Sequence, residues 1–277
     1  MMRKSVALSL FVLCLGLGVT LKAQSGEPES DVFTTIDIPG ASSTQAIGIN
    51  SRGDVVGFYV TDGVQHGFLR SDDSVTTVDV PGASLTQPAG INPRGDIVGF
   101  YVSDGVMRGF LLSDDSFTTF DFGPLGINPR GDIVGVQSIN GVVHAFLLSR
   151  GEFTLFDFPG ASFTSALGIN ARGDIVGNYA IGGLFHGYLL SGGELSSVEV
   201  PGASATFSRG INNRGNIVGN YTSAGATHGY LLRGGEFTTI DFPGASSTGA
   251  AAINSRGEIV GTYTIGGVTH SYQLTER

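Results

Sequence analysis

The sequence contains very little cysteine and very little lysine, and both residue types are confined to its first 23 residues. Cys14 is the only cysteine, and Lys4 and Lys22 are the only lysines, among 277 residues. Without Cys14 the chain can form no disulfide, no thiolate metal site and no cysteine nucleophile. Its stability would then depend on a large apolar core, and the 254 residues from position 24 onward are enough to build one.

The N-terminal segment predicts export. Basic residues precede the apolar run Ser5–Val19, and the small residue Ala23 follows it, which is the order of a secretory signal peptide cleaved near Ala23. The run is shorter than the ~20 residues of a membrane helix, so we expect no membrane span. A lipoprotein anchor at Cys14 is the alternative, but Leu13 is bulky where such signals usually carry a small residue.

The predicted signal peptide indicates where the mature domain begins and where the mature protein is located. We assign residues 1–23 to the signal peptide, residues 24–32 to a disordered linker and residues 33–277 to a single domain. The mature protein is expected outside the cytoplasm, in the periplasm or the extracellular medium, as a monomer.

Basic residues are scarce in the remaining chain. Once Arg3, Lys4 and Lys22 are removed, 12 arginines face 24 aspartates and glutamates, a net charge of −12. So acidic a chain repels phosphate backbones, which excludes nucleic acid as the expected partner. No pattern for a cofactor or a metal is present, so neither is expected.

What the sequence does contain is one unit repeated six times. The units begin at positions spaced by 42, 42, 36, 42 and 42 residues, and each reads approximately F-T-T-x-D-x-P-G-A-S-x-T-x-x-x-G-I-N-x-R-G-D-I-V-G-x-Y-x-x-x-G-x-x-H-G-F-L-L. The short third unit lacks the P-G-A-S-x-T loop. The first residues of the six units are Phe33, Val75, Phe117, Phe153, Leu195 and Phe237.

Each unit contains four strand candidates. In the second unit they are Val75–Val80, Ala89–Asn92, Asp96–Val102 and Arg108–Leu112, which are rich in β-branched and aromatic residues and bounded by turn residues. The 44 glycines and the absence of helical periodicity argue against helices. Six units of four strands predict an all-β, six-bladed β-propeller with blades of about 42 residues.

The phase of the repeat predicts how the ring closes. The chain starts with an F-T-T-x-D strand and ends with a G-x-x-H-S-Y-Q-L strand. If F-T-T-x-D is the outermost strand of the preceding sheet, residues 33–38 should complete the blade formed by residues 251–274. Closure of this kind removes an unpaired strand edge.

Arg-Gly-Asp occurs in four of the units and raises the possibility of an adhesion ligand. However, N-x-R-G has the residue preferences of a type I turn followed by a left-handed glycine, the chemistry of a tight hairpin. The fifth and sixth units carry Asn216 and Glu258 in place of the aspartate. We therefore interpret the tripeptide as a hairpin turn.

The five histidines occupy one position of the unit, where the second unit has Arg108. A catalytic histidine needs to occur only once, so we interpret the set as structural, with a ring that binds a ligand as the alternative and zinc as the less favoured occupant. The residues are His66, His144, His186, His228 and His270.

Two further repeated positions have structural interpretations. The tyrosines at Tyr59 and its equivalents are expected to pack between blades, with an aromatic rim for sugars as the alternative. The aspartate of F-T-T-x-D is expected to anchor the following P-G-A-S turn. The acidic S-D-D-S turns are read as solvated, with a loose calcium site as the alternative.

Departures from the repeat indicate where a unique site would lie. The third unit lacks its crossover loop and its tyrosine, so a notch lined by Arg108, Asp121, Gln137 and His144 is predicted between the second and third blades. Arg209 is the second departure, because it stands where other units have an apolar residue. It is predicted to face the central channel and attract an anion. Ordinary divergence of the repeats is the alternative for both.

The segment His144-Ala145-Phe146, its variants His-Gly-Phe, His-Gly-Tyr and His-Ser-Tyr, and the preceding G-I-N-x-x-G-x-I-V-G resemble the HAF-type extracellular repeat family over residues 33–274. The resemblance implies a secreted bacterial protein with propeller-like repeats, and it implies no particular activity.

These observations predict a secreted binding or interaction module for an extracellular carbohydrate or other polymer. The long crossover loops of a rigid scaffold are the expected binding face, and they supply many hydroxyl groups. A polysaccharide hydrolase or lyase with its site near the second and third blades is the alternative, with Asp121 paired to His144 or Arg108. A purely structural envelope protein is the third class.

Overall fold

The computed structural model describes residues 32–72 and 74–275. The predicted signal peptide, and the predicted linker up to residue 31, lie outside the described residues. Val32, which the sequence assigned to the linker, is the first residue of a strand. Every regular element of the described part of the chain is a β-strand, as predicted.

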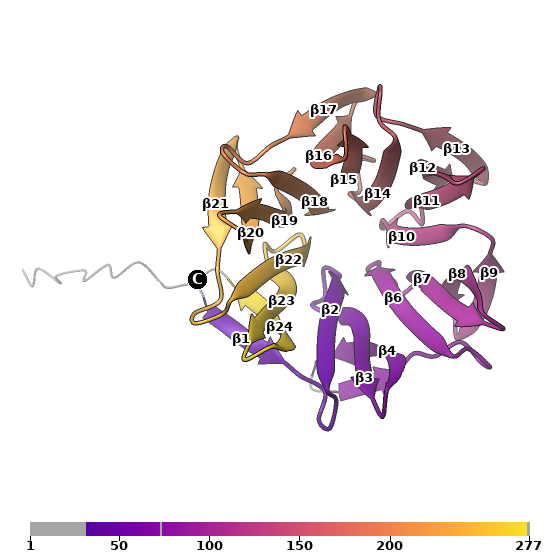
Figure 1. Ribbon diagram of the computed structural model, residues 1–277. Helices are drawn as coiled ribbons and strands as arrows, with labels where there is room; N and C mark the ends of the chain where they lie inside the picture. Colours follow the sequence, from indigo (N-terminus) through magenta and orange to yellow (C-terminus); the bar gives the residue numbers. More distant parts are fainter. Residues whose placement is uncertain (1–31, 73, 276–277) are drawn as a thin grey trace, which may run out of the picture. The chain divides into compact units, whose positions relative to one another are not determined.

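Three strands of each repeat and the first strand of the next repeat around the ring form a set of four antiparallel strands, ordered outward from the centre (Figure 1). The inner strands are β2 (Ser43–Ile49), β6 (Leu85–Ile91), β10 (Gly123–Ile127), β14 (Phe163–Ile169), β18 (Ala205–Ile211) and β22 (Ser247–Ile253). The second strands are β3 (Val55–Thr61), β7 (Ile97–Ser103), β11 (Ile133–Ile139), β15 (Ile175–Ile181), β19 (Ile217–Ser223) and β23 (Ile259–Ile265).

The remaining strands lie farther from the centre. The third strands are β4 (Val64–Ser71), β8 (Val106–Ser113), β12 (Val142–Ser149), β16 (Leu184–Ser191), β20 (Ala226–Arg233) and β24 (Val268–Thr275). The outer strands are β1 (Val32–Ile36), β5 (Ser74–Thr77), β9 (Ser116–Phe120), β13 (Glu152–Phe156), β17 (Glu194–Val198) and β21 (Glu236–Ile240).

These strands form five hydrogen-bonded sheets in the described chain. Four sheets have four strands, and the fifth has eight because one parallel pair, Gln65 with Leu85, joins β4 to β6. The eight-stranded sheet contains β2 to β9, the first two sets of four strands, and β5 pairs only with β4. Four-stranded antiparallel sheets are thus confirmed, whereas the count of six blades stays a prediction.

The predicted closure of the ring is present. β1 pairs antiparallel with β24, from Val32 opposite Thr275 to Ile36 opposite Ser271, and completes the sheet β1-β24-β23-β22. Figure 1 shows β1, in indigo, beside the yellow C-terminal strands. The two ends of the described chain are therefore held together by main-chain hydrogen bonds.

Strand boundaries differ from the sequence-based ones at the crossover loops. The second repeat's inner strand starts at Leu85, four residues before the predicted Ala89, and its outer strand ends at Thr77. The crossover therefore consists of residues 78–84, and the last two residues of the P-G-A-S-x-T motif, Leu85 and Thr86, already belong to the inner strand.

The core lies between neighbouring sheets. The aromatic residue of H-G-F-L-L is fully buried in every repeat, and the strand that precedes it contributes an I-V or V-V pair of small exposed fraction. These aromatic residues are Phe68, Phe110, Phe146, Tyr188, Tyr230 and Tyr272. Each sheet consequently buries apolar side chains on both of its faces, which explains the short, almost continuously apolar strands.

Candidate functional site

The Asn-x-Arg-Gly hairpins hold their own polar groups, as the fourth repeat shows. The side-chain oxygen of Asn170 accepts hydrogen bonds from the backbone N–H groups of Arg172, Gly173 and Asp174 at 2.9, 3.1 and 3.0 Å. Its amide nitrogen donates to Asp174 Oδ2 at 2.7 Å and to the carbonyl of Asn212 in the next repeat at 3.2 Å. Gly173 has φ 93°, which suits glycine. The turn prediction is confirmed.

The aspartate of Arg-Gly-Asp points inward. Asp174 is 8 % exposed and accepts hydrogen bonds from Ser191 and Arg172 at 2.7 and 2.6 Å. Burial raises the pKa of this carboxyl, but the hydrogen bonds from Asn170, Ser191 and Arg172 outweigh that cost and lower it. Asp54, Asp96 and Asp132 have the same partners in their own repeats, and their pKa values are lowered in the same way. A carboxylate so engaged is not available to an adhesion receptor.

Each histidine of the third strands forms a pair with a carboxylate that follows the outer strand of its sheet. In four pairs the carboxylate comes thirteen residues later in the sequence, and in the fifth it comes from the N-terminal end of the described chain. The Nδ1-to-carboxylate distances are 2.6 to 3.0 Å. The pairs are His66–Asp79, His144–Asp157, His186–Glu199, His228–Asp241 and His270–Asp37. The last pair joins the two ends of the described chain. The partner of the histidine is therefore the aspartate of F-T-T-x-D.

The repeated tyrosine lies against this pair. Tyr59 and His66 face each other across β3 and β4, and their rings stack at 5.4 Å. Tyr179, Tyr221 and Tyr263 stack on their own histidines in the same way. Tyr101, Tyr179 and Tyr263 are buried, and Tyr59 and Tyr221 are half-buried against core clusters. The packing interpretation holds, because none of the five is exposed.

Threonine, and not aspartate, anchors the crossover turn. In five repeats the hydroxyl of the threonine accepts a hydrogen bond from the backbone N–H six residues earlier, at 2.9 to 3.1 Å. The predicted role of the aspartate was wrong because its side chain crosses to the histidine instead. The five threonines are Thr44, Thr86, Thr164, Thr206 and Thr248.

A pocket lies beside one of the histidines on the crossover face. It has a volume of about 240 Å³ and is lined by His228, Asp241, the loop Phe242–Ser246 and the strand start at Ser247 and Thr248. Since Nδ1 of His228 is bonded to Asp241 at 3.0 Å, the other ring nitrogen remains for a ligand. Hydroxyl, imidazole and carboxylate groups line one small hollow.

The notch residues do not form the predicted site. His144 is bonded to Asp157 at 2.8 Å, and Gln137, its neighbour across β11 and β12, donates to the carbonyl of Ser138. Asp121 is exposed and Arg108 half-buried, and no hydrogen bond or ion pair within the described residues joins either one to His144.

Aromatic side chains pack together at the shortened crossover of the third repeat. Phe122 contacts Phe146 and Phe153 at ring-centroid distances of 4.8 and 5.1 Å, and it stacks on Phe120 at 4.6 Å. Phe122 directly follows Asp121 in the shortened crossover. A phenylalanine cluster thus lies at this part of the third repeat. The equivalent Phe242, beside a full-length crossover, packs against Phe33 and Tyr272 in the corresponding way.

The central channel is lined by residues that a backbone irregularity turns inward. Each inner strand contains a β-bulge, whose extra residue has no partner on the neighbouring strand. The extra residues all line one cavity of about 90 Å³ in the channel. They are Ile47, Ala89, Leu125, Leu167, Arg209 and Ala251.

Arg209 is the only charged residue among the described residues that line this cavity. Its side chain is exposed, but only to the channel, since the inner strands surround it. Burial among these strands lowers the pKa of the guanidinium group, and the nearby Tyr230 offsets part of the effect. The predicted position of Arg209 in the channel is therefore observed.

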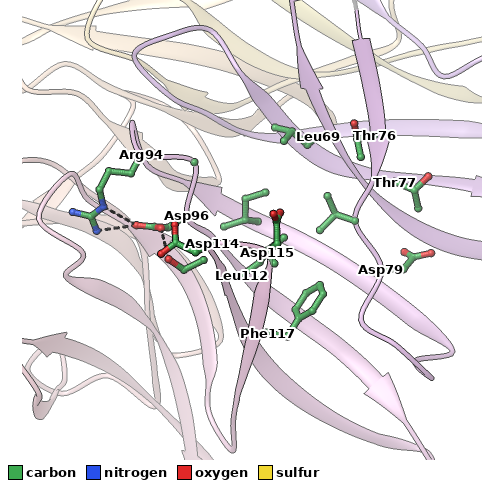
Figure 2. A pocket seen from close by; sticks show the side chains of 14 residues that line it. Leu69, Thr76, Thr77, Asp79, Arg94, Asp96, Leu112, Asp114, Asp115 and Phe117 are labelled. Carbon is green, nitrogen blue, oxygen red and sulfur yellow. Dashed lines mark hydrogen bonds and ion pairs between the residues drawn. The ribbon is translucent and has the colours of Figure 1, made fainter.

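A cleft that the sequence did not indicate lies between the first and second repeats. Figure 2 shows Arg94 bonded to Asp96 at one side, with Asp114, Asp115 and Phe117 beside them. The cleft has a volume of about 570 Å³, and its remaining lining comes from both halves of the eight-stranded sheet. The acidic turn at Asp114 and Asp115 is the only sequence signal of the cleft. An exposed acidic turn does not by itself indicate a cleft.

The described residues contain neither a cluster suited to a metal ion nor a helix suited to cross a membrane. Within residues 32–72 and 74–275, no group of three or more histidine, cysteine, aspartate or glutamate residues is placed to hold a metal ion. In the same residues, no helix has the length and apolar character required to cross a membrane.

Comparison with solved structures defines the fold class. A streptogramin B lyase matches at a TM-score of 0.53 and 15 % identity, over 88 % of this chain and 98 % of that one. The aldose sugar dehydrogenase of Streptomyces coelicolor matches at 0.51 and 11 % identity, over 89 % and 98 %. The fucose-specific lectin of Aleuria aurantia matches at 0.50 and 15 % identity, over 87 % and 93 %.

These proteins share a fold with this chain and, at such identities, nothing finer. The chain is an all-β protein of the β-propeller class. No family model and no curated protein sequence matches it.

Proposed function

We propose that this protein is a secreted, six-bladed propeller of the HAF-type repeat family that binds an extracellular carbohydrate through its crossover face. The six-blade count treats the eight-stranded sheet as two blades, because a single parallel pair holds its halves together. Secretion rests on the signal-peptide pattern of residues 1–23. We further propose a monomer, in line with the pairing of β1 and β24 of the same chain, which needs no second copy.

The observation that carries the binding function is the repeated histidine–carboxylate pair beside the hydroxyl-rich crossover. At His228 these groups line a pocket of about 240 Å³, below the ~300–1,000 Å³ of sites for drug-sized ligands. A hollow of this size accommodates one sugar residue. Sugar hydroxyls both donate and accept hydrogen bonds, and imidazole, carboxylate and hydroxyl groups together satisfy both roles.

Repetition adds to the strength of such binding. Five repeats carry the pair, so we expect a polysaccharide to contact several of these pairs at once. Linked binding events raise the overall affinity without new contacts. Lectins and sugar-converting enzymes among the propellers of similar fold are consistent with this proposal.

The test is glycan binding by wild-type protein and by a His228→Ala variant, measured by glycan array and then by calorimetry with the selected glycan. We expect the occupied pocket to bind about tenfold more weakly in the variant, since one to two hydrogen bonds of about 1 kcal/mol are lost. Ser255→Ala, in an Asn-x-Arg-Gly hairpin, is the control and should bind like wild type.

A second variant makes the result decisive. If a protein with all five histidines replaced by alanine folds, as judged by its circular dichroism, and still binds the selected glycan at full strength, the crossover pockets are not the binding sites. Loss of binding in that variant alone would support several equivalent pockets.

A further inference from the structure

We propose that the central channel binds a small oxyanion, a carboxylate, sulfate or phosphate group, through Arg209. This proposal goes beyond glycan binding, since it concerns the channel and not the crossover pockets. The Arg209 guanidinium group has no counter-charge within the described residues. No hydrogen bond or ion pair joins the Arg209 guanidinium to any of residues 32–72 and 74–275.

Most arginines of the Asn-x-Arg-Gly hairpins, by contrast, do have a counter-charge. Five of them form ion pairs with the carboxylate two residues later, at 2.6 to 2.8 Å. They are Arg52, Arg94, Arg130, Arg172 and Arg256. A cation that faces apolar side chains across a narrow channel is stabilised by a nearby anion. We therefore expect an anion from the solvent to bind the Arg209 guanidinium group.

The surroundings of Arg209 strengthen the attraction for an anion. The equivalent bulge residues Ile47, Leu125 and Leu167 are apolar and share the channel with it. Charges interact more strongly in such a low-dielectric setting than in water. The planar guanidinium fork also matches the geometry of carboxylate and phosphate oxygens.

The size of the channel restricts the occupant. The cavity around Arg209 measures about 90 Å³, which is the volume of about three water molecules at ~30 Å³ each. One oxyanion group fits this space, and a sugar ring with its hydroxyls does not. A second cavity of about 210 Å³ adjoins it at the Asn-x-Arg-Gly end, where both share the isoleucines that end the inner strands, and gives the ion a route of entry.

The same repeat provides a second, independent departure. Every other described repeat has a carboxylate after Arg-Gly, but the fifth has Asn216. Arg214 accordingly has no ion pair with its own hairpin, and within the described residues its guanidinium has no side-chain partner. Arg214 lies in the hairpin that follows β18, the strand of Arg209. The two arginines make this sector positive in a chain of net charge −9.

The experiment titrates the full-length protein with inorganic phosphate, sulfate and acetate at constant ionic strength, with chloride as the balancing anion. Calorimetry and the thermal unfolding midpoint are the two readouts. We expect saturable binding of at least one anion by wild type, with a rise in the midpoint, and the order of the three anions identifies the preferred group. Arg209→Leu, which copies Leu125 and Leu167, should bind at least tenfold more weakly.

Two further variants serve as the charge control and as the replacement if Arg209→Leu does not fold. Arg150→Gln, at an exposed turn between β12 and β13, is the matched control for loss of one positive charge and should bind within twofold of wild type. If Arg209→Leu does not fold, Arg209→Gln takes its place. The proposal is overturned if none of the three anions binds saturably to wild type, or if the Arg209 variant binds as tightly as wild type does.

Discussion

Replacing Gly177 with alanine is expected to lower the free energy of unfolding by about 3 kcal/mol or more, the upper end of the cost of overpacking. Gly177 lies in β15 opposite the bulge of β14, and a Cβ atom there would stand 1.8 Å from the carbonyl oxygen of Ser165. Main-chain atoms of a central sheet cannot move away as a side chain can. Chemical denaturation of the variant measures the effect.

A second glycine provides the control. Gly182 has φ 60°, and no atom lies within 4 Å of a Cβ built on it. Asn140, at the equivalent position of the third repeat, adopts φ 52°. Gly182→Asn should therefore stay within about 0.5 kcal/mol of wild type. Equal losses in Gly177→Ala and Gly182→Asn would contradict the steric explanation.

Acid is expected to destabilise the protein through the four aspartates of its Arg-Gly-Asp hairpins acting together. Their pKa values lie below the ordinary 3.8 in the folded state, because hydrogen bonds from serine, asparagine and arginine outweigh the effect of burial. The unfolded state therefore binds more protons at low pH. Their stabilising contribution is complete above about pH 5, and it is lost as the pH falls through 3.8 toward the lower folded-state values.

Urea unfolding between pH 7 and pH 2 tests this prediction. Asp174→Asn copies the natural Asn216 of the fifth repeat, so the hairpin should still fold while one titrating carboxyl is removed. We expect the free energy of unfolding to depend less steeply on pH below 5 in this variant, and progressively less as the other three aspartates are replaced. An unchanged slope in the fourfold variant would show that other carboxyls cause the acid loss.

Much of the fold could be predicted from the repeat alone. Strand number, strand order and the pairing of the N-terminal strand with the C-terminal sheet follow from the period and phase of the pattern. The Asn-x-Arg-Gly hairpin was also predictable, because its preferences are local: Asn170 caps backbone groups no more than four residues away. Hydrogen bonds between neighbouring residues produce residue preferences that a short sequence motif shows.

Side-chain partners across strands were harder to predict. The sequence assigned Asp79 to the following turn, but it bonds His66 at 2.6 Å, and the turn is held by Thr86. Both alternatives involve a short polar side chain near a turn. The register of β4 against β5 decides between them, and the repeat pattern does not state that register.

The candidate sites show the same division. Arg209 was correctly placed in the channel because its departure from five apolar equivalents could be read in the sequence. The predicted notch near Asp121 did not form as a site, because His144 bonds Asp157 and Gln137 bonds the carbonyl of Ser138. The cleft of Figure 2 had no sequence signal beyond its acidic turn, since it depends on how two repeats stand against each other.

By itself the sequence determined what every repeat shares: the strands, the tight hairpins, the closed ring and the lack of any cysteine chemistry after residue 14. Only the tertiary structure decided where the exceptions matter. It turned the extra residue of each bulge into the channel, satisfied the Arg-Gly-Asp carboxylates internally and gave His144 and Gln137 of the expected notch other hydrogen-bond partners. The physical reason is that repeated local interactions are written into each unit, whereas cavities and unpaired charges arise from the packing of different units against one another.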